Sequence, residues 1–169
     1  MERFDIVDTD GTIIGEATRA ECHAGTFLLH PVVHVFVFRP DGRLILQKRS
    51  MSKDIQPGRW DTSIGGHIHA GESTDEALLR ESEEELGIRG ALFEELYSYI
   101  MQSDVEREYV TTFRCQWEGP LRHQQEEIDE LRSFSCEEIE ERLGTGFFTP
   151  NFEEEWERYK TWLQTHNAD

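Results

Sequence analysis

The chain of 169 residues has the length of one ordinary domain, long enough to bury a hydrophobic core without disulfides. Its 37% hydrophobic and 11% aromatic residues exclude wholesale disorder. The net charge of −18 excludes a generic nucleic-acid binder, because such a protein needs basic side chains to neutralise phosphates.

The N-terminal segment predicts a hairpin. Phe4–Val7 and Thr12–Ile14 flank the turn sequence Asp8–Gly11, so we place a hairpin within residues 1–20. The segment is acidic and lacks the apolar stretch of a signal peptide. No apolar run approaches the roughly 20 residues that span a bilayer. We therefore expect a cytoplasmic protein with no membrane partner.

The rest of the chain mixes strands and helices without a regular alternation. Apolar runs predict strands, and capping residues mark helices that begin at Ser73 and Asn151. The expected strands are 32–38, 44–47, 97–100 and 109–117, and the expected helices are 73–87, 137–143 and 151–166. This order favours an α+β fold or an α/β/α sandwich over a doubly wound parallel sheet.

The strongest chemical signal is a concentration of carboxylates. Seven acids and one base lie between Glu72 and Glu85. At about 100° per residue, Glu81, Glu84 and Glu85 share one arc of a helix. The neighbouring, core-facing arc is expected to hold Leu78, Leu79, Ser82 and Leu86.

The crowded carboxylates have two interpretations. A run of glutamates is usually a solvated helix face. Hard cations such as Mg²⁺ or Mn²⁺, however, take oxygen ligands and would relieve the repulsion. Gly65 and Gly66, just before the helix, can bring backbone groups close to a ligand and so favour the metal site.

Residues 66–88 resemble the Nudix box. The pattern is Gly66, five residues, Glu72, seven residues, Arg80-Glu81, two residues, Glu84-Glu85, one residue, and Gly87 followed by an apolar residue. Only Ser82 departs from it, where the family prefers an apolar side chain. The resemblance implies one Nudix domain over residues 1–169, an α+β Nudix α/β/α sandwich with a mixed sheet, and divalent-metal chemistry.

The resemblance also implies roles for individual residues. Glu81, Glu84 and Glu85, with the carbonyl of Gly66, are the implied ligands of Mg²⁺ or Mn²⁺. Arg80 is expected to orient the glutamates. Glu84 is the first candidate for the general base and Glu127 the second. Arg49 and Lys53 are candidate phosphate contacts by analogy, with ordinary surface charge as the alternative.

A wider resemblance points to the isopentenyl-diphosphate-isomerase-like branch of the superfamily. The residues that show this resemblance are 49–53, 57–60 and 66–67. It implies a possible second divalent metal held by His23, His30, His67, Glu106 and Glu108. The resemblance then fails, because Gly65 stands where the isomerase has its catalytic cysteine. The isomerase also replaces two box glutamates, which this chain keeps as Glu81 and Glu84.

The sequence thus predicts metal-dependent hydrolysis of a phosphoanhydride bond in a small diphosphate compound, such as a nucleoside diphosphate linked to another moiety. The alternatives are isopentenyl-diphosphate isomerase and a non-catalytic diphosphate-binding module. The expected partner is the small-molecule substrate, with no nucleic acid. The oligomeric state is left open, with a homodimer among the candidates.

Overall fold

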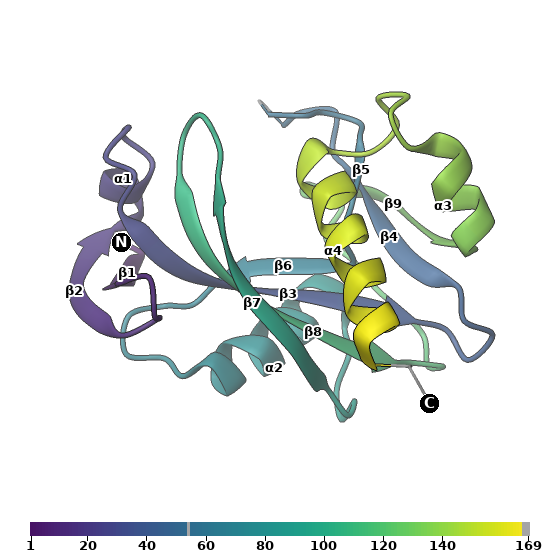
Figure 1. Ribbon diagram of the computed structural model, residues 1–169, viewed down its shortest axis with the longest axis horizontal. Coiled ribbons are helices and arrows are strands. Elements are labelled where there is room, and N and C mark those ends of the chain that lie inside the picture. Colours follow the sequence, from purple (N-terminus) through teal and green to yellow (C-terminus); the bar gives the residue numbers. More distant parts are fainter. Residues whose placement is uncertain (54, 167–169) are drawn as a thin grey trace.

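The computed structural model describes residues 1–53 and 55–166 (Figure 1). Its strands are β1 (Arg3–Val7), β2 (Ile13–Thr18), β3 (Leu29–Phe38), β4 (Leu44–Arg49), β5 (Trp60–Asp61), β6 (Ile64–His67), β7 (Glu94–Gln102), β8 (Arg107–Gln116) and β9 (Ile128–Phe134). Its helices are α1 (Arg19–Cys22), α2 (Thr74–Leu86), α3 (Cys136–Arg142) and α4 (Pro150–His166). None of these helices is long and apolar enough to cross a membrane.

The strands form two sheets. β1 and β2 make the expected antiparallel hairpin. The larger sheet has the order β5-β4-β3-β8-β7, with β6 paired to β3 and β9 paired to β4. β3 and β8 run parallel, whereas the other pairs are antiparallel. The predicted α+β class with a mixed sheet is therefore confirmed.

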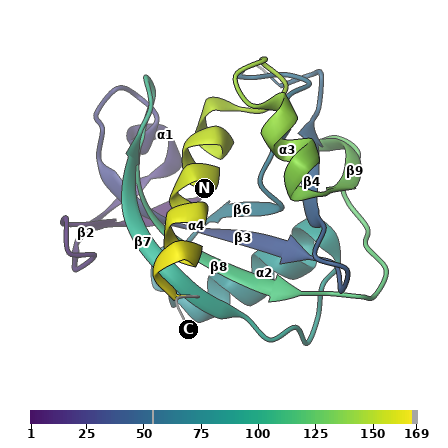
Figure 2. The same ribbon diagram turned by 45° about the vertical axis from the view of Figure 1, so that its right-hand side comes forward.

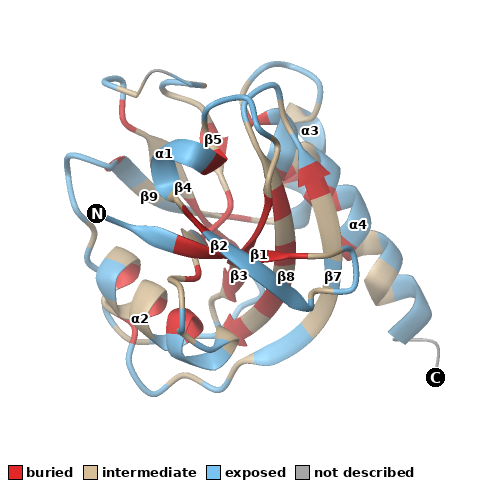
Figure 3. Cartoon of the chain, turned by 90° about the vertical axis from the view of Figure 1, so that its left-hand side faces the viewer, coloured by how far each residue is buried: buried red, intermediate tan, exposed pale blue. Residues whose placement is uncertain are grey.

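Helices cover both faces of the larger sheet (Figure 2). Because side chains alternate along β3, Val33, Val35 and Val37 pack with α2, whereas Phe36 packs with α4. The buried residues lie mainly on the central strands, and the outer surfaces of the helices are exposed (Figure 3). This is the predicted α/β/α sandwich.

Two strands, β6 and β4, pair with successive parts of β3. β6 pairs with Val32–Val35, whereas β4 pairs with Val37 and Phe38 farther along the same strand. The fully buried Ser63 lies between these two pairings, where its hydroxyl accepts from Val37 N at 2.9 Å and donates to the carbonyl of Ile45. Among the described strands β6, which carries the glycine pair, therefore pairs with β3 alone.

Two helix expectations need correction. Leu79 is 56% exposed, so the buried arc of α2 consists of Ala77, Leu78, Ser82 and Leu86. The last helix is capped by Thr149, whose hydroxyl accepts from Phe152 N at 3.1 Å, with proline following at the first helical position. Asn151 is therefore inside the helix rather than at its cap.

Candidate active site

Local signals fix the box helix α2. Ser73 accepts from Glu76 N at 3.1 Å, and the Glu76 carboxylate accepts from Ser73 N at the same distance. At the other end Gly87 has a φ of 71°, a left-handed conformation that suits glycine. Between these caps, one face of the helix packs on the sheet core and carries the glutamates along its rim.

Gly66 has a steric reason to be glycine. It lies on β6 opposite Val33, on the face of the sheet that meets α2. A β-carbon at this position would overlap the carboxylate of Glu81. The glycine thus allows the helix carboxylate to approach the strand backbone directly.

Arg80 is the anchor of the box. Its Nε and Nη2 donate to the two oxygens of Glu72 at 2.8 and 2.9 Å. Its Nη1 donates to Glu81 at 2.8 Å and to Glu84 at 3.2 Å, and its Nη2 also reaches the carbonyl of His67 at 3.0 Å. The bidentate pair holds the pKa of Glu72 below its usual range and raises that of Arg80.

Two of the box carboxylates are held in a poorly solvated position. Glu85 accepts from Gln47 Nε2 and from Gly65 N, both at 3.2 Å. Burial, then the charge of Glu81, raises the pKa of Glu85 well above its ordinary value. Burial also raises the pKa of Glu81, against the opposing effect of Arg80. Such a pair of half-buried acids suits a divalent cation with oxygen ligands.

Glu84 differs from its two neighbours. Its side chain is 56% exposed, against 13% for Glu81. It lines a pocket of about 610 Å³ at the C-terminal end of α2. Glu84 is therefore the most exposed member of the arc.

The other candidates for base and phosphate contact have partners of their own. Lys53 pairs with Glu127, and Arg49 lies 3.8 Å from Asp61 and donates to the carbonyl of Ile55 at 3.0 Å. Within residues 1–53 and 55–166, no hydrogen bond or ion pair joins Glu127, Arg49 or Lys53 to a box glutamate.

The predicted histidines and acids of the second locus converge. Glu106 Oε1 lies 3.0 Å from His23 Nε2, 3.1 Å from His30 Nε2 and 3.7 Å from His67 Nε2. One ligand atom from each of these four residues falls within 4.8 Å of all the others. Glu108 joins them through Oε2, which is 3.6 Å from His67 Nε2.

Neighbouring charges strongly change the pKa values at this locus. Burial opposes ionisation, yet the hydrogen bond from His30 and the nearby imidazole of His67 hold the pKa of Glu106 far below its usual range. Burial and the charge of Glu106 raise the pKa of Glu108 to about 8. Burial also lowers the pKa of His67, whose Nε2 is buried without a hydrogen-bond partner among the described residues. That unsatisfied nitrogen fits a metal-ligand role.

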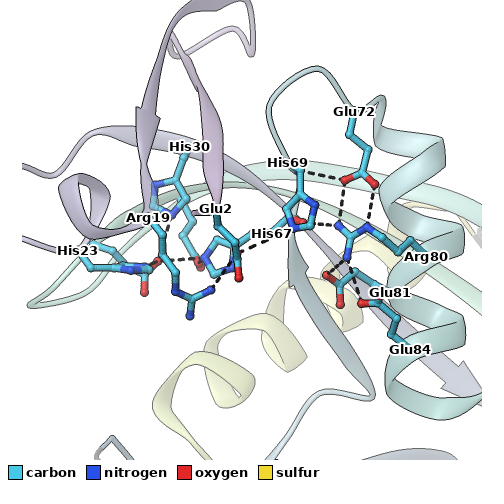
Figure 4. A network of polar contacts seen from close by, with 12 residues as sticks. Glu2, Arg19, His23, His30, His67, His69, Glu72, Arg80, Glu81 and Glu84 are labelled. Carbon is cyan, nitrogen blue, oxygen red and sulfur yellow. Dashed lines mark hydrogen bonds and ion pairs between the residues drawn. The ribbon is translucent and has the colours of Figure 1, made fainter.

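The two loci meet at His67. Its carbonyl accepts from Arg80, and its ring belongs to the histidine group, as Figure 4 shows. The N-terminal hairpin covers this junction, because the ring of Phe4 stacks on His67 at 4.6 Å and on His30 at 5.5 Å between centroids. A residue of the box loop thus connects both groups.

Sequence reasoning assigned no role to a loop beside the box. The pocket at the end of α2 is also lined by Arg122, His123 and Gln124. His123 Nδ1 is buried and lacks a hydrogen-bond partner in the part of the chain that the structure describes. No motif marks this loop, so only the packing of Arg122 over Gly87 reveals its position.

Comparisons with known proteins agree with this geometry. The family described as the NUDIX domain matches residues 28–157. A Nudix hydrolase of Yersinia pestis is 36% identical over 151 residues, covering 89% of this chain and 81% of that protein. The Nudix hydrolase YfcD of Escherichia coli K12 is 33% identical over 150 residues, covering 89% and 82%.

Solved structures support the same fold. A Deinococcus radiodurans protein superposes with a TM-score of 0.80 at 24% identity, covering 93% of this chain and 98% of that one. A MutT protein from Methanosarcina mazei has a TM-score of 0.67 at 21% identity, covering 83% and 96%. Together with the sequence matches, the box geometry leads to the conclusion that this chain belongs to the Nudix family and is a hydrolase of diphosphate-containing substrates.

Proposed function

We propose that the chain catalyses metal-dependent hydrolysis of a phosphoanhydride bond in a small diphosphate compound, of the class in which a nucleoside diphosphate is linked to another moiety. The observation that carries the proposal is the Arg80 anchor, which gathers Glu72, Glu81 and Glu84 beside Gly66. Binding alone does not need the full set of box glutamates, which disfavours a non-catalytic module.

Glu81, Glu84 and Glu85, with the carbonyl of Gly66, would hold Mg²⁺ or Mn²⁺. The half-buried Glu81 and Glu85 support this assignment, because a divalent cation would stabilise the ionised forms that burial disfavours. An ion held there would neutralise charge on the leaving phosphate and make a water molecule more nucleophilic.

The other roles in the reaction fall to side chains of the protein. Arg80 orients the glutamates through its five hydrogen bonds. Glu84 takes the proton of the attacking water, since it is the exposed member of the arc; Glu127 is the second candidate. Arg49 and Lys53 would bind substrate phosphate by exchanging their present carboxylate partners for it.

A second divalent ion would be held by His23, His30, His67, Glu106 and Glu108. The convergence of their ligand atoms and the unsatisfied Nε2 of His67 support this site. Mixed imidazole and carboxylate ligands suit several divalent ions. Membership of the isomerase-like branch stays a prediction.

The test of the main proposal is the substitution Glu84→Gln, which removes a charge and keeps the shape. A metal ligand or general base at this position predicts a loss of at least roughly 100-fold in kcat. Turnover is measured by phosphate release with Mg²⁺ or Mn²⁺ over nucleoside, sugar and isoprenoid diphosphates.

The matched control is Asp75→Asn, which removes one exposed carboxylate from the first turn of the same helix. This substitution should leave kcat within about twofold of the wild-type value. Near-normal turnover of the Glu84→Gln variant, with its fold intact by circular dichroism, would contradict the proposed role.

A further inference from the structure

A buried polar cluster lies beneath α4, on the face of the sheet opposite α2. Glu155 of α4 is 2% exposed and accepts four hydrogen bonds from three strands. The donors are His34 Nδ1 at 2.6 Å, Thr112 Oγ1 at 2.7 Å, Tyr99 Oη at 2.9 Å and Tyr97 Oη at 3.0 Å. Each carboxylate oxygen accepts two of these bonds, so Glu155 is fully satisfied as an anion.

The charge of the cluster has to be balanced. Three of the four donors are neutral hydroxyl groups, and a buried carboxylate needs a counter-charge. Among the described residues, His34 is the one group that hydrogen-bonds to Glu155 and can carry a positive charge. Although burial opposes protonation, the carboxylate raises the pKa of His34 to about 9. The imidazole is therefore a cation whose two ring nitrogens both donate.

The second ring nitrogen of His34 is left free. Nε2 makes no hydrogen bond within the described residues, and the side chain retains 15% exposure. Opposite His34 on β6 lies Gly65. A β-carbon on Gly65 would sit 3.4 Å from His34 Cδ2 and 3.7 Å from Nε2, so the glycine keeps this side of the ring uncovered.

This free donor adjoins the box. Gly65 N donates to Glu85 at 3.2 Å, so one residue separates the imidazole from a box carboxylate. The surroundings are otherwise acidic, and the charges of Glu108 and Asp61 also act on His34. An anionic substrate entering such a site needs a positive hydrogen-bond donor.

Three other basic groups near the site already have carboxylate partners. Arg80, Arg49 and Lys53 each pair with a carboxylate of the chain. The His34 ring, by contrast, is held by one carboxylate at Nδ1 and presents Nε2 outward. Fixing the ring in advance removes the entropic penalty of ordering it when the ligand binds.

We propose that His34 is a substrate-binding residue whose Nε2 donates a hydrogen bond to a non-bridging oxygen of the substrate's diphosphate, and that Glu155 is the positioning residue that holds it. The inference rests on the proposed diphosphate hydrolase and adds a recognition group outside the box. No bond is formed or broken at His34 itself.

The direct test follows the histidine ring by nuclear magnetic resonance. Histidine-labelled protein saturated with Mg²⁺ is titrated with methylenediphosphonate, a diphosphate analogue that cannot be hydrolysed at its bridge. The His34 Nε2 signal should shift with the same midpoint as probe binding measured by calorimetry. A purely structural histidine would not respond.

Variants give an independent measure. His34→Asn keeps a side-chain nitrogen near the Nδ1 position and removes Nε2, and Glu155→Gln removes the charge that holds the ring. Each should raise the Kd of the probe roughly 10- to 100-fold, the value of a charge-assisted hydrogen bond. The Kd of the double variant should be no higher than that of either single variant, because both substitutions remove the same contact.

The matched control is Tyr159→Phe, one turn farther along α4, where the hydroxyl accepts from Arg114 at 3.0 Å. It removes one hydrogen bond from the same helix and should leave the Kd unchanged. Circular dichroism and melting temperature monitor the fold of every variant.

The outcomes separate this inference from the proposed function. Probe binding without a response of the His34 signal, and with an unchanged Kd for His34→Asn, overturns the inference. A probe that does not bind at millimolar concentration overturns it as well. A His34 response in a protein that hydrolyses no diphosphate overturns the proposed function and leaves the inference standing.

Discussion

Two adjacent glycines serve different faces of β6. Gly66 makes room for the carboxylate of Glu81 on the side of α2, whereas Gly65 leaves the ring of His34 uncovered on the side of α4. Ser82, the departure from the box pattern, is fully buried, which explains the usual preference for an apolar side chain there. Helical periodicity correctly predicted that the three glutamates share one side of α2. It wrongly predicted that Leu79 faces the core, because periodicity does not show how much of a helix the sheet covers.

The glycine at position 65 leads to a prediction about the type of reaction. The side chain of glycine can neither donate nor accept a proton, so alkene isomerisation lacks an acid–base partner at this position. We expect no conversion of isopentenyl diphosphate to dimethylallyl diphosphate. Product analysis after incubation with Mg²⁺ or Mn²⁺ is the measurement, and accumulation of dimethylallyl diphosphate at enzyme-like rates would show that another residue supplies the missing group.

At the scale of elements, capping chemistry decides where helices begin. Both helix α2 and helix α3 start with a reciprocal capping box, and the sequence pattern around Ser73 identified the first of them. For α4 the sequence analysis expected Asn151 as the cap, two residues after the one that the structure shows. The structure selects Thr149, because its backbone also bonds to Trp60 of the sheet at 2.9 Å and fixes the start of the helix.

This choice of cap is testable by stability. Thr149→Ala should lower the free energy of unfolding by about 1 kcal/mol, since it removes the acceptor for Phe152 N. Asn151→Ala should change it by less than about 0.5 kcal/mol, because Asn151 is exposed in the first turn. Urea denaturation compares the two. A larger loss for Asn151→Ala would return the cap to the position expected from sequence.

At the scale of the whole molecule, three distant segments meet in one place. His23 and His30 lie before and on β3, His67 ends β6, and Glu106 and Glu108 flank the start of β8. The parallel pairing of β3 with β8 sets His30 beside Glu108, and the pairing of β6 with β3 adds His67. The hairpin β1–β2 then closes over the group through Phe4.

A metal bound by these segments should stabilise the whole fold. The protein is first freed of metal by chelation and dialysis. Adding Mn²⁺ at about 100 times its Kd should then raise the free energy of unfolding by about 2.7 kcal/mol, or the melting temperature by roughly 5–10 °C. His23→Ala should remove most of that gain, whereas His69→Ala, at a half-buried neighbour outside the group, should keep it.

The pH dependence has a defined sign. Protons compete with the metal for imidazole nitrogen, so the gain is present at high pH and is lost as pH falls below the histidine pKa values. Burial lowers the pKa of His67, which keeps that ligand neutral to a lower pH than an ordinary histidine. An equal response of wild type and His23→Ala to Mn²⁺ at every pH would argue against the site.

The sequence by itself determined the features that depend on neighbouring residues. The box helix, its caps, its arc of three glutamates and the family resemblance all follow from local spacing between residues 66 and 88. The resemblance also named the histidines and acids of the second locus in advance, although it did not show that they converge.

The tertiary structure decided what depends on long-range pairing. β6 and β9 became strands because β3 and β4 offered them free edges, a fact that short apolar runs do not reveal. His34 lies in an apolar strand, and no local pattern links it to its partner Glu155, 121 positions away in sequence. Since a side chain's partner depends on which strands and helices are packed together, the free donor beside the box could be recognised only in the folded chain.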